Sequence, residues 1–202
     1  MSDTAQGSGR LVLVRHAETE WSLAGRHTGT TDLPLTAEGR VKAGQTAQAL
    51  QAMTFKTVLT SPLQRARTTC QIAGYADRAL LRDELVEWDY GDYEGLSTEQ
   101  IRERDPGWEL WTDGAPHGES PEQVQARIDQ LVVELTDLAR DGDVAIFAHG
   151  HILRALAVRW ADLPITAGRV LRLGTATIST LNWKREIRVI DRWNDDSHLR
   201  QP

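Results

Sequence analysis

A chain of 202 residues with 40% hydrophobic content fits one domain with a sizeable core. Its formal net charge of −6 argues against proteins that bind nucleic acids or anionic membrane surfaces, because no basic excess exists to neutralise phosphates. The single cysteine, Cys70, excludes an intrachain disulfide and favours a reducing compartment, so we expect a cytoplasmic protein. The sequence shows neither a secretory signal nor a run of ~18 apolar residues that could span a membrane.

The predicted organisation is one domain over residues 10–194, between a mobile tail over residues 1–9 and a polar tail over residues 195–202. The continuous apolar run of residues 11–14 predicts a strand buried on both faces of a sheet, and this strand ends at Arg15-His16. Residues 18–35 form a long loop rich in Thr, Gly and Asp, and such a loop directly after a strand is often functional.

The middle of the chain alternates predicted helices and strands. Thr36 caps a helix to about Ala52, residues 57–61 form a strand, and Pro62 opens the next helix. We expect a third strand within residues 80–86, a loop over 88–95, a short helix over 96–104 and irregular structure over 108–119.

The second half contains the clearest helix. Ser120-Pro121-Glu122-Gln123 has the form of a capping box, and an apolar stripe at helical spacing follows it as far as Asp141-Gly142. Residues 144–148 predict another buried strand, which ends in His149-Gly150-His151, and a helix follows over 152–160. Residues 176–183 and 186–193 predict a hairpin. This order predicts an α/β fold, a three-layer α/β/α sandwich with a mostly parallel central sheet.

Polar side chains follow three of the predicted strands. Arg15 and His16 follow the first, Arg65 lies in the helix after the second, and His149 follows the strand at 144–148. Because the carboxyl ends of parallel strands share one edge of a sheet, these groups can converge there. Arginine geometry suits a phosphoryl or carboxylate group, and the helix that begins near Gly150 adds backbone N–H groups. The sequence therefore predicts an anion site.

Four motifs in these segments, RHAETEW, SPLQRA, ELVEWDYGDYEG and FAHGH, resemble those of the histidine phosphatase superfamily. That superfamily contains phosphoglycerate mutases and acid phosphatases, and the resemblance covers the chain from about Leu11 to Trp160. Within it, this sequence looks closest to the branch containing sedoheptulose-1,7-bisphosphatases. The resemblance implies a phosphoglycerate mutase-like fold and a phosphatase that acts on a small phosphorylated metabolite, first of all a sugar phosphate.

The resemblance also implies roles for individual residues. His16 matches the nucleophile that carries a phosphohistidine, Glu87 matches the general acid, and the phosphate pocket corresponds to Arg15, Arg65 and His149. Cationic side chains do the electrostatic work, so no metal ion or cofactor is implied. The candidate substrate-binding residues are Ser22, Arg26, Thr28, Gly29, Tyr90, Gly150 and His151. Of these, Thr28, Gly29 and Tyr90 match substrate-contact positions of the family, while Arg26, with Arg154, offers a spare donor for a far phosphate or sugar hydroxyls.

Several alternatives stay open at this point. A phosphoglycerate mutase is disfavoured because residues 95–120 are too short for the mutase insertion and have Thr98 near its lysine position. A non-catalytic regulatory member is a second alternative. His149-x-His151 could be half of a metal site, and Glu87 could belong to a solvated acidic face. The sequence also leaves open a homodimer.

Overall fold

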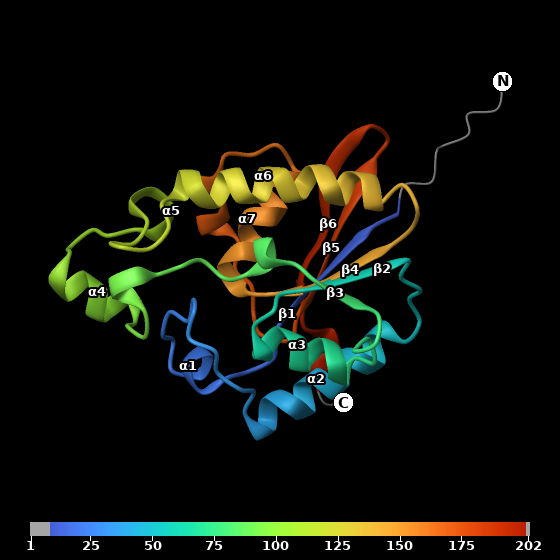
Figure 1. The fold of residues 1–202 in the computed structure, drawn as a ribbon, viewed down its shortest axis with the longest axis horizontal. Helices are drawn as coiled ribbons and strands as arrows, with labels where there is room; N and C mark the ends of the chain where they lie inside the picture. The colour runs from blue at the N-terminus through green and yellow to red at the C-terminus, as the bar shows by residue number, and fades with distance from the viewer. Residues whose placement is uncertain (1–8, 201–202) are drawn as a thin grey trace.

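The computed structural model describes residues 9–200, which form one six-stranded sheet in the order β3-β2-β4-β1-β5-β6. Figure 1 shows helices on both faces of this sheet. Four strands are parallel: β1 (Leu11–Arg15), β2 (Thr57–Thr60), β3 (Ala79–Leu81) and β4 (Val144–Ala148). The other two, β5 (Ile178–Lys184) and β6 (Ile187–Asp195), form an antiparallel hairpin at one edge. The predicted three-layer α/β class and the late hairpin are confirmed.

The helices lie in two layers. Helices α6 (Pro121–Leu138) and α7 (Gly150–Trp160) cover one face of the sheet, and α2 (Ala37–Leu50) and α3 (Gln64–Ile72) cover the other (Figure 1). Shorter helices α1 (Glu20–Leu23), α4 (Thr98–Arg104) and α5 (Leu110–Asp113) lie beyond the sheet. None of the helices in the described part of the chain is long and apolar enough to cross a membrane.

Strand β1 shows why the first apolar run is continuous. Leu11 and Leu13 pack into the large core beneath α6 and α7, whereas Val12 and Val14 pack into the smaller core beneath α2 and α3. Successive side chains of a strand point to opposite faces, so a strand covered on both sides needs an apolar residue at every position. This double burial fixes the place where β1 ends and polar residues begin.

Helix α6 forms as predicted. Ser120 Oγ accepts a hydrogen bond from the Gln123 backbone at 3.3 Å, and the Gln123 side chain accepts one from the Ser120 backbone at 2.8 Å. These two bonds satisfy backbone donors that the first turn of a helix leaves free. The stripe from Val124 to Leu135 is buried in the large core.

The predicted third strand is wrong over most of its length. β3 ends at Leu81, and residues 83–85 form a 3₁₀ turn instead. Leu80 and Leu81 are 49% and 51% exposed on the edge of the sheet, so nothing there favours a longer strand. The turn instead buries Leu85 in the large core, and the chain then continues to Glu87.

Two segments contain more regular structure than expected. The short helices α1 and α5 lie within the predicted loop over 18–35 and the predicted irregular segment over 108–119. After β6, residues 197–199 form a 3₁₀ turn whose His198 Nε2 lies 2.9 Å from the carbonyl oxygen of Ala176. The end of the described chain therefore packs against the loop before β5.

Candidate active site

The carboxyl ends of three neighbouring strands meet at one edge of the sheet. Arg15 pairs with Ala148, and Thr60 pairs with Phe147, so β1, β4 and β2 end level with one another. The residues that follow are His16, His149 and Ser61. The ring centroids of His16 and His149 lie 5.2 Å apart. The predicted convergence of strand-end residues is therefore present in the structure.

Within residues 9–200, one ring nitrogen of His16 makes a hydrogen bond and the other makes none. Its Nδ1 lies 2.7 Å from the carbonyl oxygen of Ala17, and because that oxygen only accepts, Nδ1 carries the proton. Nε2 is left with its lone pair. Burial, followed by the positive charges of Arg15 and Arg65, lowers the pKa of His16 well below its usual 6.5. The imidazole is therefore neutral at physiological pH, as a nucleophile must be.

Arg15 presents an unpaired donor beside His16. Within residues 9–200, its Nε is buried and has no hydrogen-bond partner, while Nη1 donates to the carbonyl oxygen of Leu173. A Cβ on Gly150 would lie 3.2 Å from the Arg15 Cζ, so the missing side chain lets the guanidinium pack against the start of α7. A buried N–H without a partner is costly, and an anion at this point would satisfy it.

Arg65 and His149 form a buried pair behind the nucleophile. Arg65 Nε donates to His149 Nδ1 at 3.0 Å, so His149 carries its proton on Nε2 and donates it to Ser61 Oγ at 2.8 Å. The rest of the Arg65 guanidinium donates to the carbonyl oxygens of Thr28, Gly29 and Thr31 at 2.9–3.0 Å. No role was predicted for Ser61, although its place directly after β2 matches those of His16 and His149.

Glu87 closes the beginning of α7. Its carboxylate accepts hydrogen bonds from the backbone of His151 at 3.0 Å, Ile152 at 2.9 Å and Trp88 at 3.0 Å. The N-cap residue His149 has no side-chain capping bond, so Glu87 supplies the cap from outside the helix. Glu87 is only 5% exposed, and the alternative of a solvated acidic face is therefore wrong for this residue.

A cleft of about 180 Å³ opens over these groups. It is smaller than the ~300–1,000 Å³ typical of sites for drug-sized ligands, so it suits a small substrate. The predicted residues that line it are Arg15, His16, Ser22, Arg26, Thr28, Glu87, Tyr90, Gly150 and His151. His27 also lines it, and burial lowers the pKa of His27 to about 4.

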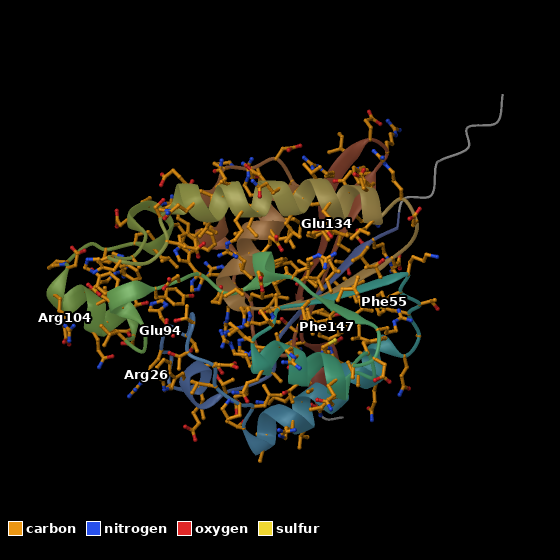
Figure 2. The ribbon with its side chains drawn as sticks, viewed as in Figure 1. Arg26, Phe55, Glu94, Arg104, Glu134 and Phe147 are labelled. Carbon is orange, nitrogen blue, oxygen red and sulfur yellow. The ribbon has the colours of Figure 1, made fainter. Side chains whose placement is uncertain are left out.

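Three predicted site residues do not line the cleft. Arg65 and His149 lie behind His16, and Gly29 is packed into the neighbouring loop. The Gly29 backbone donates to both oxygens of Glu94 at 2.9 Å, and a Cβ on Gly29 would lie 2.5 Å from the carbonyl oxygen of Trp88. Glu94 thus holds the loop from one side while Arg65 holds it from the other. Figure 2 shows Glu94 at the same end of the molecule as Arg26.

The loop before β5 also positions the nucleophile. The Ala176 N–H donates to the carbonyl oxygens of Arg15 at 3.1 Å and His16 at 3.2 Å. Ala176 has a φ of 61°, a left-handed conformation that costs a non-glycine residue ~1–2 kcal/mol. Thr46 Oγ1 holds the Ala176 carbonyl oxygen at 2.9 Å. Nothing in the local sequence indicates this arrangement, because alanine is not a residue expected at positive φ.

The histidine pair does not have the geometry of a metal site. Both ring nitrogens of His149 are engaged by Arg65 and Ser61, and Nδ1 of His151 lies 2.6 Å from the Tyr90 hydroxyl. Among residues 9–200, no group of three His, Cys, Asp or Glu side chains could hold a metal ion.

Comparison with known proteins identifies the family. Residues 11–196 match the model of the histidine phosphatase superfamily (branch 1). The chain belongs to this superfamily. It is 41% identical to an acid phosphatase of Mycobacterium tuberculosis over 89% of each chain. It is also 35% identical to the sedoheptulose 1,7-bisphosphatase of Saccharomyces cerevisiae, over 77% of this chain and 69% of that protein.

The fold agrees with this assignment. The solved structure of an open reading frame of Mycobacterium tuberculosis superposes with a TM-score of 0.89 at 39% identity, covering 92% of this chain and 97% of the other. The family match and the phosphatases among its relatives support a phosphoric monoester hydrolase, as the four motifs predicted.

Proposed function

We propose that this histidine phosphatase hydrolyses phosphomonoesters of small metabolites, with sugar phosphates as its substrate class, through a phosphohistidine on His16. The observation that carries the proposal is the neutral His16 at a small cleft, beside Arg15: within residues 9–200, neither Nε2 of His16 nor the buried Nε of Arg15 has a hydrogen-bond partner. The name of the yeast relative, a sugar bisphosphatase, supports the substrate class.

In the first step, His16 Nε2 attacks phosphorus and the bond from phosphorus to the ester oxygen breaks. Arg15 Nε and the Gly150 N–H, which has no acceptor within its helix, bind oxygens of the transferring group. Glu87, in its protonated form, gives its proton to the leaving oxygen. The phosphoryl group is then on Nε2, and the alcohol product leaves.

In the second step, water attacks the phosphohistidine and Glu87 takes a proton from it. The bond between Nε2 and phosphorus breaks, which returns a neutral His16 and inorganic phosphate. We assign Arg65 and His149 to the same phosphoryl pocket: the charge of Arg65 stabilises the transferred group from behind, and His149 Nε2–H can turn from Ser61 to a phosphoryl oxygen.

We also propose that the enzyme acts in the cytoplasm on small metabolites. The single cysteine of the chain, Cys70, is a buried free thiol whose pKa burial raises to about 12. A chain with no intrachain disulfide is suited to a reducing compartment.

Phosphate release from a panel of phosphorylated metabolites tests this function. The panel includes sedoheptulose bisphosphate, several sugar monophosphates and 3-phosphoglycerate. We expect free phosphate from sugar phosphates. Conversion of 3-phosphoglycerate into its 2-phospho isomer without phosphate release would instead show a mutase.

Chelation with EDTA should leave activity unchanged. Because Arg65, Ser61 and Tyr90 already engage three of the four ring nitrogens of His149 and His151, these histidines cannot jointly bind an ion without rearrangement. Phosphate release is measured before and after dialysis against EDTA. Loss of activity on chelation, restored by added zinc, would instead support a metal site at His149 and His151.

Arg26→Ala should raise the activation free energy that corresponds to kcat/KM on a sugar bisphosphate by ~1–3 kcal/mol, as for a lost charge-assisted hydrogen bond. Arg26 lines the cleft, is exposed and has no side-chain partner within residues 9–200, so its planar guanidinium is available to a second phosphate. Arg154 is less available, because it donates to the Gly168 and Arg169 carbonyl oxygens at 3.0 and 3.2 Å.

The control for Arg26 is p-nitrophenyl phosphate, which has no second phosphate. The Arg26→Ala variant should hydrolyse it nearly as well as wild type. Similar losses on both substrates would mean that Arg26 serves the fold or the reacting phosphate.

A further inference from the structure

One polar pair on the cleft wall has no part in the two steps above. Tyr90 is 1% exposed, and its hydroxyl lies 2.6 Å from Nδ1 of His151. The ring of His151 also packs near Trp111 and His27, at centroid distances of 5.7 and 5.8 Å. A short hydrogen bond in such closely packed surroundings holds both rings in one orientation.

Both groups in this hydrogen bond are neutral. Burial, with the negative charge of Glu87, raises the pKa of Tyr90 well above its usual 10.0, so the hydroxyl keeps its proton. Burial, followed by the positive charge of Arg154, lowers the pKa of His151 well below 6.5, so the ring is neutral. Nδ1 of His151 is the one hydrogen-bond partner that the Tyr90 hydroxyl has within residues 9–200, so we assign the hydroxyl as the donor to Nδ1, which places the single ring proton of His151 on Nε2.

Nε2 of His151 is left open toward the cleft. Within residues 9–200 this nitrogen makes no hydrogen bond, and it is not a fully buried atom. His151 lines the same cavity as His16 and Glu87, and its backbone N–H is bonded to Glu87 Oε2. A neutral N–H donor thus stands in the cavity that holds the reacting groups.

We propose that Tyr90 is a positioning residue that locks His151 in its Nε2–H form, and that His151 donates this hydrogen bond to a substrate hydroxyl next to the phosphoester. Only the contact between His151 and a substrate hydroxyl rests on the proposed phosphatase function. A neutral donor suits an uncharged hydroxyl, whereas a second phosphate favours a cation such as Arg26. The pair therefore favours phosphates of polyols and sugars over esters that have no neighbouring hydroxyl.

Nitrogen-15 NMR of the whole protein tests the lock without any substrate. The His151 signals are assigned by their loss in His151→Asn, and the spectrum is recorded at neutral pH, where protonated and bare ring nitrogens have widely separated shifts. Wild type should show only the Nε2–H form of His151, and Tyr90→Phe should show a mixture of both forms. Tyr93→Phe is the matched control, because its hydroxyl contacts Asp105 at 3.5 Å and it does not line the cleft. A ring proton on Nδ1 of His151 in the wild type would contradict the proposal that Tyr90 holds His151 in its Nε2–H form.

Kinetics test the hydroxyl contact. On a sugar phosphate, Tyr90→Phe should lower kcat/KM about 3- to 10-fold, as for one neutral hydrogen bond. In a His151→Asn background the same change should have less than about a twofold effect, because Tyr90 acts through His151. On p-nitrophenyl phosphate, which has no neighbouring hydroxyl, each single change should lower kcat/KM by a clearly smaller factor than on the sugar phosphate.

The contrary outcomes are distinct. Losses that multiply in the double variant would overturn the positioning role, because Tyr90 would then contact the substrate itself. Equal losses on both substrates would overturn the hydroxyl contact. Wild type without phosphatase activity would contradict the proposed function, while the NMR result would still decide the lock.

Discussion

Glu87→Gln should lower turnover of a sugar phosphate by about 10²–10⁴-fold, the usual contribution of a general acid. Glutamine keeps the size of the side chain but has no proton to give to an alkoxide leaving group. p-Nitrophenolate leaves without such help, so p-nitrophenyl phosphate should lose much less. The measurement is kcat on both substrates for wild type and variant.

The comparison of two substrates also separates chemistry from folding. Glu87 caps α7 through the His151 and Ile152 N–H groups, and glutamine cannot satisfy both as well as a carboxylate does. A displaced helix would slow both reactions alike. Equal losses would therefore mean that Glu87 acts by holding the helix and not as the general acid.

His16→Ala should abolish turnover on every substrate, with a loss of about 10⁴-fold or more, as expected when a nucleophile is removed. An activated leaving group cannot compensate, because the attacking atom itself is missing. The loss should therefore be as large on p-nitrophenyl phosphate as on a sugar phosphate, in contrast to the pattern for Glu87→Gln.

His117→Ala is the matched control. His117 is exposed and contacts Asp92 at 2.9 Å away from the cleft, so its removal should leave turnover unchanged. Substantial residual activity of His16→Ala, above the background of a mock purification, would assign the nucleophile to another side chain or to water.

The centre of this site could be predicted from the sequence because its strands are buried on both faces, and the first polar residue after such a strand marks where the strand ends. β1 and β4 are apolar at nearly every position, so the first polar residues after them, His16 and His149, mark the carboxyl edge of the sheet. The cap of α6 could also be predicted, since a capping box is a local sequence pattern. In both cases the signal lies within a few residues of the element that it defines.

The supports of the site could not be predicted in this way. Arg65 is held by carbonyl oxygens of residues 28–31, and the same loop is held by Glu94, far away in the sequence. The short β3 ends where it does because Leu85 finds a place in the core, which depends on α6 and α7. Such contacts depend on the packing of segments that are distant in the sequence, and the hydrophobic periodicity within one segment does not predict them.

The most direct test of the account is to trap the phosphoryl group on the enzyme. Wild type and His16→Ala are mixed with a substrate labelled in the phosphoryl group and quenched within one turnover in alkaline denaturant. We predict label on wild type alone, stable in base and released by acid, and located on Nε2 of His16 because Ala17 holds Nδ1. Equal labelling of both proteins, or label on any other residue, would contradict the phosphohistidine mechanism.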